Sequence, residues 1–270
     1  MSNLVKTEAI VLSRSDFSNT SRIFTFLTPA HGLVGAILKG ARRPTGRAGL
    51  GGGLDLLSEN EILYYARRGG SLAVLAEWSE MRSWPELGNS AARLAASGVL
   101  AEFALRCASE GEDSQGAYAL LGEWTRLAAG AQRLLPAALG AALGLLSLAG
   151  FRPAAAACAA CGRRPSGGAW KRGAVLSAGG LGLLCERCSP GRGPKDGSVR
   201  LSGEACGLLG ALLRLKPAAA VRLRPSRRAE VELMRAIETY ACWRLECRMR
   251  SLSMLARVIE GLETAGLRCR

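Results

Sequence analysis

Histidine is nearly absent from this chain, because His31 is the only one among 270 residues. An H-E-x-x-H motif is therefore impossible, and no clustered carboxylates suggest a nuclease or another metal-dependent hydrolase. The sequence thus argues against an enzyme. Since His31 lies between Ala30 and Gly32, it is expected to be a turn residue.

Long apolar runs are also scarce. The longest covers residues 134–149, contains Pro136, Gly140 and Gly144, and is shorter than the roughly 20 residues that span a bilayer. It predicts a buried helix. No signal-peptide pattern opens the chain, and nine cysteines are an odd number, so a reduced, cytoplasmic protein is expected.

Four of the cysteines form two C-x-x-C pairs separated by 23 residues, Cys158 with Cys161 and Cys185 with Cys188. Such pairs bring four thiolates to one point, and this ligand set suits one Zn²⁺ ion in a small ribbon. Four protein ligands leave no open position, so the zinc would be structural. Two disulfides, or four unrelated thiols, are the alternatives. The other cysteines are expected to be buried thiols: Cys107, Cys206, Cys242, Cys247 and Cys269.

Positive charge is concentrated in the second half of the chain. The net charge is +14, yet residues 81–150 carry five basic and six acidic residues. Residues 151–200 carry nine basic and two acidic residues, and residues 201–270 carry 13 and seven. This excess on the cysteine segment and the C-terminal region indicates a polyanionic partner, with nucleic acid favoured.

The first 80 residues have the pattern of an all-β domain. Strands are predicted near residues 4–12, 22–27, 33–39, 54–66 and 71–79, with a polar loop at 13–21 and a glycine-rich connection at 40–53. Five short strands with this spacing favour an OB-type barrel, and an SH3-like barrel is the alternative.

Basic residues of this domain concentrate in its connections, where loops of OB barrels flank the oligonucleotide face. Phosphate contacts are therefore predicted there, with Phe17, Phe24 or Tyr64 as possible stacking partners for bases, although Phe24 and Phe26 fit a core better. Solvated loops with no ligand would look similar. The candidate residues are Arg14, Arg22, Lys39, Arg42, Arg43, Arg47, Arg67 and Arg68.

Helical periodicity begins after residue 85. Apolar stripes predict helices around residues 96–107, 120–128 and 134–149, and Ser202 is a plausible N-cap for a helix that ends at Lys216-Pro217. A final helical region is predicted over about 226–263, with a break near Ser251. Arg244 and Arg248 would lie one turn apart on it and are further candidates for DNA contact, although a solvated helix face is equally compatible.

Several segments, in the same order along the whole chain, resemble the RecO family of bacterial DNA-repair proteins. They are residues 7–12, 21–28 and 32–34, the string Leu38-Lys39-Gly40-Ala41-Arg42-Arg43-Pro44, and the arginine-rich residues 245–252. The four cysteines are similar to those of its zinc-bearing branch. Residues 46–53 depart from the family, because relatives often have polar and apolar residues instead of this run of glycines.

The resemblance implies a multidomain α+β protein. An OB barrel at residues 1–80 would precede an all-helical domain at 81–270, with the zinc module inserted at about 152–198. It also implies a non-enzymatic, nucleoid-associated recombination mediator, in which Lys39, Arg42 and Arg43 match the family's DNA-contacting motif. Such proteins bind single- and double-stranded DNA, anneal strands, engage the acidic tail of single-strand-binding protein, and work with RecR to load RecA.

A second class of function fits the same features. Zinc together with an OB barrel is also compatible with an interaction module that acts on RNA or on a transcription complex. Preference for RNA over single-stranded DNA would distinguish the two.

Overall fold

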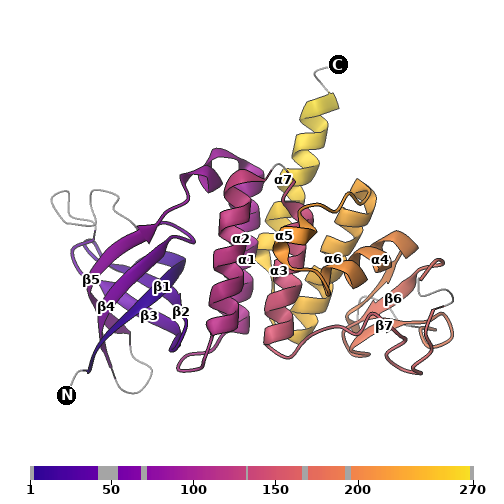
Figure 1. Cartoon of the computed structure of the whole chain (residues 1–270), viewed down its shortest axis with the longest axis horizontal. Helices are drawn as coiled ribbons and strands as arrows, with labels where there is room; N and C mark the ends of the chain where they lie inside the picture. Colours follow the sequence, from indigo (N-terminus) through magenta and orange to yellow (C-terminus); the bar gives the residue numbers. More distant parts are fainter. Residues whose placement is uncertain are drawn as a thin grey trace.

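The protein is elongated, with a β-barrel at one end, helices in the middle and a small β-sheet at the other end (Figure 1). In this computed structural model the described residues are 3–41, 54–67, 72–131, 133–165, 170–191 and 196–267. The predicted glycine-rich connection therefore lies mostly outside the described residues, as does most of the predicted hairpin tip after Arg67.

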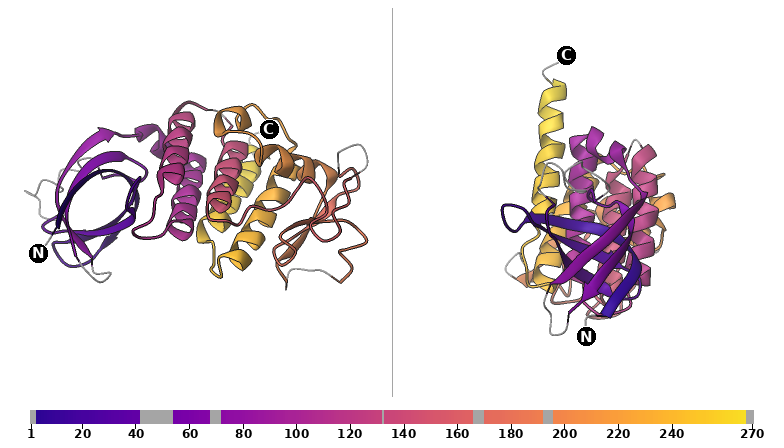
Figure 2. Two further views of the ribbon diagram at one scale, coloured as in Figure 1. Left: turned by 60° about the horizontal axis from the view of Figure 1, so that its bottom comes forward. Right: turned by 90° about the vertical axis from the view of Figure 1, so that its left-hand side faces the viewer.

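The barrel consists of β1 (Asn3–Asp16), β2 (Arg22–Thr28), β3 (Gly32–Leu38), β4 (Glu59–Ala66) and β5 (Ala73–Arg82). Its strands follow the order β1-β2-β3-β5-β4, and β1 pairs with β4 to close it (Figure 2). Only β3 and β5 run parallel. This closed five-stranded arrangement confirms the predicted OB-type barrel.

The first strand is longer than predicted, since β1 continues through Arg14 to Asp16 after a register shift between Val11 and Ser13. From Ala9 to Leu12, before that extension, both faces of β1 are buried. Ala9 and Val11 point into the barrel, whereas Ile10 and Leu12 join the core of the helical region. The fourth strand is shorter than predicted, because it begins at Glu59.

A short 3-10 helix, η1 (Pro85–Asn89), leads into α1 (Ala91–Cys107), α2 (Gln115–Gly130) and α3 (Leu135–Leu148). As predicted, α3 is a buried helix, and it packs against α1, α2, α4, α5 and α6. None of the described helices has the length and apolarity needed to cross a bilayer.

The C-terminal helices differ in two places from the prediction. Ser202 caps α4 (Gly203–Leu212) as expected, but Pro217 begins another helix, α5 (Pro217–Ala220), rather than ending the helical run. The last region is divided into α6 (Arg227–Arg244) and α7 (Arg250–Leu267), a few residues before the predicted break. α7 packs along α1 and then extends beyond the body (Figure 1).

Between α3 and α4, the chain forms a three-stranded sheet of order β7-β6-β8. Its strands are β6 (Ala174–Ser177), β7 (Gly182–Leu184) and β8 (Ser198–Leu201). Leu176, Leu183 and Leu201 belong to the same apolar core as the helices. The inserted module is therefore packed onto the helical body and is not a loosely tethered finger.

Candidate functional site

The four cysteines of the two C-x-x-C pairs converge at the edge of the small sheet. Their sulfur atoms all lie within 4.8 Å of one another, and the Sγ atoms of Cys161 and Cys185 are 3.8 Å apart. A disulfide would require about 2 Å. Tetrahedral thiolates at about 2.3 Å from a zinc ion would be roughly 3.8 Å from each other. The four residues could therefore hold one metal ion.

Backbone hydrogen bonds shape both turns. Cys158 donates its N–H to the carbonyl of Arg163 (2.9 Å), and Gly162, at φ +69°, donates to Cys158 (2.8 Å). The second pair directly follows β7, and Cys188 donates to the carbonyl of Cys185 (2.9 Å). The short strand and the glycine turn thus place the ligands, and the Cys185 N–H also donates to the Cys158 sulfur (3.4 Å).

The thiols of this cluster are not equivalent before metal binds. Burial raises the pKa of the Cys158 thiol, but backbone N–H groups of Cys185, Cys161 and Ala160 outweigh burial and lower this pKa to about 6. Hydrogen bonds with Cys161 and Cys185 raise the pKa of Cys188 to about 12. A bound cation must therefore displace protons from the cluster.

Two of the predicted DNA-contacting residues lie close together on the barrel, and a third lies farther off. Arg22 at the start of β2 pairs with Leu38, the residue before Lys39. Ile37 pairs with Val74 of β5, which pairs with Tyr65 of β4, two residues before Arg67. Because β3 runs parallel and β4 antiparallel to β5, the chain continues to Lys39 and to Arg67 in opposite directions from this register. The register thus places Arg22 near Lys39, with Arg67 following a strand on the other side of β5.

Not all of these cations are unpaired. Arg22 forms an ion pair with Asp16 (2.9 Å), and Arg14 lies 3.8 Å from Asp55. Lys39 and Arg67 are exposed, and no ion pair is found for either among the described residues. The remaining barrel candidates lie outside the described residues: Arg42, Arg43, Arg47 and Arg68.

The aromatic candidates separate by strand alternation. Phe24 and Tyr64 are only 3% and 5% exposed, so they fill the barrel core and cannot stack on bases. Phe17, in the loop after β1, is 60% exposed. Tyr65, which was not among the predicted stacking residues, is 42% exposed on the outer face, two residues before Arg67. The alternation of Ile62 and Tyr64 toward the core would have identified it.

The two C-terminal candidates do not share a helix face. Arg244 ends α6, and its guanidinium lies 4.9 Å from the ring centroid of Phe151. Arg248 is exposed in the connection between α6 and α7. The prediction that they lie one turn apart on one helix is wrong, because the chain leaves the helix at Leu245 and Glu246 adopts φ +50°.

The comparisons with known proteins agree with this architecture. The family description "Recombination protein O N terminal" matches residues 1–84, and "Recombination protein O C terminal" matches residues 89–253. The chain belongs to the RecO family. The predicted resemblance is confirmed, and family membership places this RecO-family chain in DNA repair and recombination.

Relatives match over most of their length. The DNA repair protein RecO of Symbiobacterium thermophilum is 30% identical over 256 residues, which cover 93% of this chain and 96% of that protein. The DNA repair protein RecO of Anaeromyxobacter sp. (strain K) is 34% identical over 214 residues, covering 78% and 79%. That of Moorella thermoacetica is 34% identical over 190 residues, covering 70% and 67%.

Proposed function

We propose that this protein is a non-enzymatic recombination mediator. It binds single- and double-stranded DNA, anneals complementary strands even when single-strand-binding protein coats them, and helps RecR to load RecA on the nucleoid in the cytoplasm. The observation that carries the proposal is that Lys39 and Arg67, which follow β3 and β4 of an OB barrel in a RecO-family chain, are exposed and have no ion pair among the described residues.

The physical role is to bring two polyanions together. Strands repel one another through their phosphates, and a protein that holds both raises their effective concentration. Contacts from Lys39 and Arg67 to phosphate oxygens give affinity without sequence preference. Phe17 and Tyr65 supply exposed rings on which bases stack.

We propose that the ion held by the four cysteines is Zn²⁺. Sulfur-only ligation in tetrahedral geometry is typical of structural zinc. With four protein ligands the ion would have no position for substrate, so its contribution is to the stability of the module.

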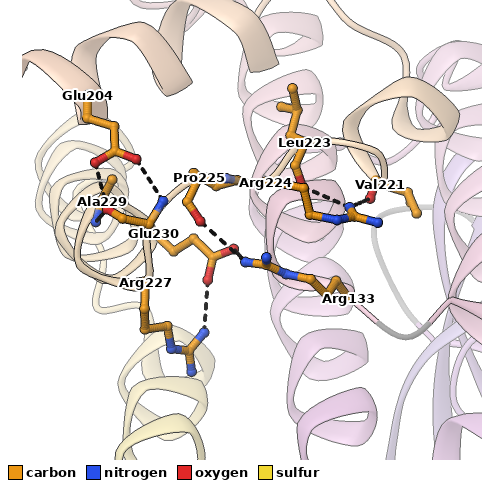
Figure 3. A network of polar contacts seen from close by, with 10 residues as sticks. Arg133, Glu204, Val221, Leu223, Arg224, Pro225, Arg227, Ala229 and Glu230 are labelled. Atoms are coloured by element: carbon orange, nitrogen blue, oxygen red, sulfur yellow. Dashed lines mark hydrogen bonds and ion pairs between the residues drawn. The ribbon is translucent and has the colours of Figure 1, made fainter.

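The acidic tail of single-strand-binding protein would fit a groove between α1, α3, α6 and α7. This groove, of about 480 Å³, has an apolar floor that includes Leu135, Leu255 and Ile259. Arg93, Arg133 and Arg227 line it as well. Arg133 (2.6 Å) and Arg227 (3.1 Å) both contact the buried carboxylate of Glu230 (Figure 3). The guanidinium groups in the lining favour an acidic peptide.

This partner assignment is tested by fluorescence anisotropy with a labelled peptide of the cognate tail. Arg227→Gln should weaken binding about tenfold, while Arg133 still neutralises Glu230. Arg222→Gln, an exposed arginine outside the groove, is the matched control. Equal binding by both variants would remove the groove from the proposal.

The function itself is tested by annealing two complementary oligonucleotides, each precoated with the cognate single-strand-binding protein, across a salt series. We expect annealing to be faster with the protein and to fade as salt rises. Lys39→Gln with Arg67→Gln should reduce it, whereas the charge-matched control Lys216→Gln with Arg222→Gln should not. No acceleration by folded, metal-loaded protein at any salt would contradict the mediator proposal. Tighter binding of RNA than of single-stranded DNA would then support the interaction-module alternative.

A further inference from the structure

The face of the small β module carries a second basic surface. A hollow of about 550 Å³ opens beside the cysteine cluster, lined by Trp170, Pro165 and Gly173 together with charged side chains. Its four cationic lining residues, here called the basic hollow, are Arg163, Lys171, Arg172 and Arg187.

The charge of the basic hollow is not compensated within the described residues. All four cations are exposed, and none has an acidic partner there within ion-pair distance. Glu186 is the acidic residue of the lining, and it lies 3.7 Å from Arg200. On the barrel, by contrast, Arg14 and Arg22 each face an aspartate. The described part of the chain thus presents a stronger unneutralised positive surface here than on the barrel.

The cysteine turns hold this surface in place. Arg163 follows Cys161 by two residues, and its carbonyl accepts the N–H of Cys158 (2.9 Å). Arg187 lies inside the second C-x-x-C turn. Because each turn is closed by its ligands, metal binding fixes the backbone of both arginines. The Trp170 indole donates to the carbonyl of Ala155 (2.9 Å), which fixes an aromatic wall of the hollow.

We propose that the basic hollow is a second DNA site, which binds the phosphodiester backbone of a single strand. Its four cations can neutralise phosphates, and Trp170 and Pro165 offer apolar surface to a base. The barrel and this module lie at opposite ends of the molecule, with the helices between them (Figure 1). One protein can therefore hold two strands, one at each end. This inference rests on the proposed function, because it names where the second strand binds.

The test measures bridging, in which one protein holds two strands at once, separately from the binding of a single strand. Two short, non-complementary oligonucleotides carry a donor and an acceptor dye, and energy transfer reports the complex in which one protein holds both. The site variant is Arg163→Gln with Lys171→Gln and Arg187→Gln. The control variant, Arg214→Gln with Lys216→Gln and Arg222→Gln, removes the same charges from exposed positions elsewhere.

We expect the site variant to bind one strand within about twofold of wild type and to lose bridging at least tenfold. The salt slope of second-strand binding should fall by about 2, since each phosphate contact on a single strand contributes about 0.7. Arg172→Glu, which leaves both cysteine turns intact, should reduce bridging in the same direction. Metal content and thermal midpoint are measured for every variant, and both should equal those of wild type.

Three results would overturn the inference. The first is that the site variant and Arg172→Glu both bridge two strands as well as wild type does. The second is that the control variant loses as much bridging as the site variant. The third is a loss of acidic-peptide binding in place of bridging, which would assign the hollow to a protein partner. If wild-type protein anneals while the site variant bridges normally, only this inference fails. If wild-type protein neither binds nor anneals DNA, the proposed function fails with it.

Discussion

At the scale of single residues, carboxylates from one helix satisfy the N-terminus of another. Glu204 of α4 accepts hydrogen bonds from the N–H (2.7 Å) and the hydroxyl (2.6 Å) of Ser226, the N-cap of α6 (Figure 3). In the same way, Glu232 of α6 accepts hydrogen bonds from the N–H and the hydroxyl of Ser202, the N-cap of α4, at 2.7 Å each. The two helices therefore cap each other, and otherwise unpaired N–H groups gain partners.

These contacts predict an acid-dependent stability. The hydroxyl and the N–H of Ser226 hold the pKa of Glu204 below its usual value of 4.5. A carboxylate with a lowered folded-state pKa stabilises the protein above about pH 4.5, and this contribution is lost as the pH falls through the lower value. Glu204→Gln should therefore lower the thermal midpoint at pH 7 and match wild type at strongly acidic pH. Thermal melts across a pH series measure this. Glu246→Gln, at an exposed position, is the control, and equal pH curves for all three proteins would contradict the prediction.

A second residue-scale prediction concerns Gly32, the first residue of β3 after the turn from β2. Its φ is +61°, and a Cβ there would lie 1.9 Å from the carbonyl oxygen of Ser109, in the connection between α1 and α2. Leu33 donates to that same oxygen (3.0 Å), and Gly111 donates to His31 (2.9 Å). The sequence reasoning placed His31 in a turn, but only the structure shows that this turn docks the barrel on the helices.

Gly32→Ala should destabilise the protein by about 2–4 kcal/mol, because it adds positive-φ strain to a backbone clash. Limited proteolysis between barrel and helices, together with thermal unfolding, measures the loss. Gly98→Ala is the matched control, since nothing lies within 4 Å of its added Cβ and α1 should gain up to about 1 kcal/mol. Wild-type stability of Gly32→Ala would show that the hairpin does not need this close approach.

At the scale of elements, the small sheet has little apolar core of its own, so a metal ion held by the four cysteines would stabilise it. Each strand has three or four residues, and the module's own cluster contains only Cys158, Val175 and Leu184 among its buried residues. So little apolar burial cannot order the segment alone. Leu176, Leu183 and Leu201 nevertheless belong to the main core. Loss of a bound metal should therefore destabilise the helical core as well as the module.

Cys158→Ser, or removal of metal by a chelator, should lower the thermal midpoint by about 10 °C through the loss of several kcal/mol. Metal analysis should give one zinc per wild-type chain, and returning zinc to the chelated wild-type protein should restore its midpoint. A metal-free Cys158→Ser protein that melts like wild type would show that the cysteine cluster contributes nothing to folding.

At the scale of the whole molecule, the barrel and the basic hollow are separated by the helices, so their contributions should be independent (Figure 1). Because either site alone can hold one strand, the loss of affinity in a protein that lacks both sites should exceed the sum of the two separate losses. A protein that carries both Lys39→Gln with Arg67→Gln and the three substitutions of the basic hollow should bind one strand at least tenfold more weakly than either parent. In each parent the remaining site still binds DNA. Anisotropy titrations at fixed salt measure this, and a combined variant no weaker than its parents would place both sets on one continuous surface.

Much of this architecture follows from local patterns. Alternating β-branched residues and glycine turns predicted five strands, apolar stripes predicted the helices, and Ser202 was identified as an N-cap from its own chemistry. The C-x-x-C spacing predicted that these four thiols form one cluster, and their sulfurs do lie within 4.8 Å of one another. These features depend on neighbours a few residues apart, and such neighbours are visible in a sequence.

The sequence by itself thus determined an OB-type barrel, a helical region, a four-cysteine cluster and the family. Only the tertiary structure decided which charges are available: Arg22 faces Asp16, Arg244 packs on Phe151, and the cations beside the cysteines have no acidic partner among the described residues. The tertiary structure also shows that Tyr65, and not Tyr64, is the exposed ring, and that Glu204 accepts a hydrogen bond from Ser226. The reason is that exposure and charge pairing depend on segments far apart in the chain, and folding alone brings these segments together.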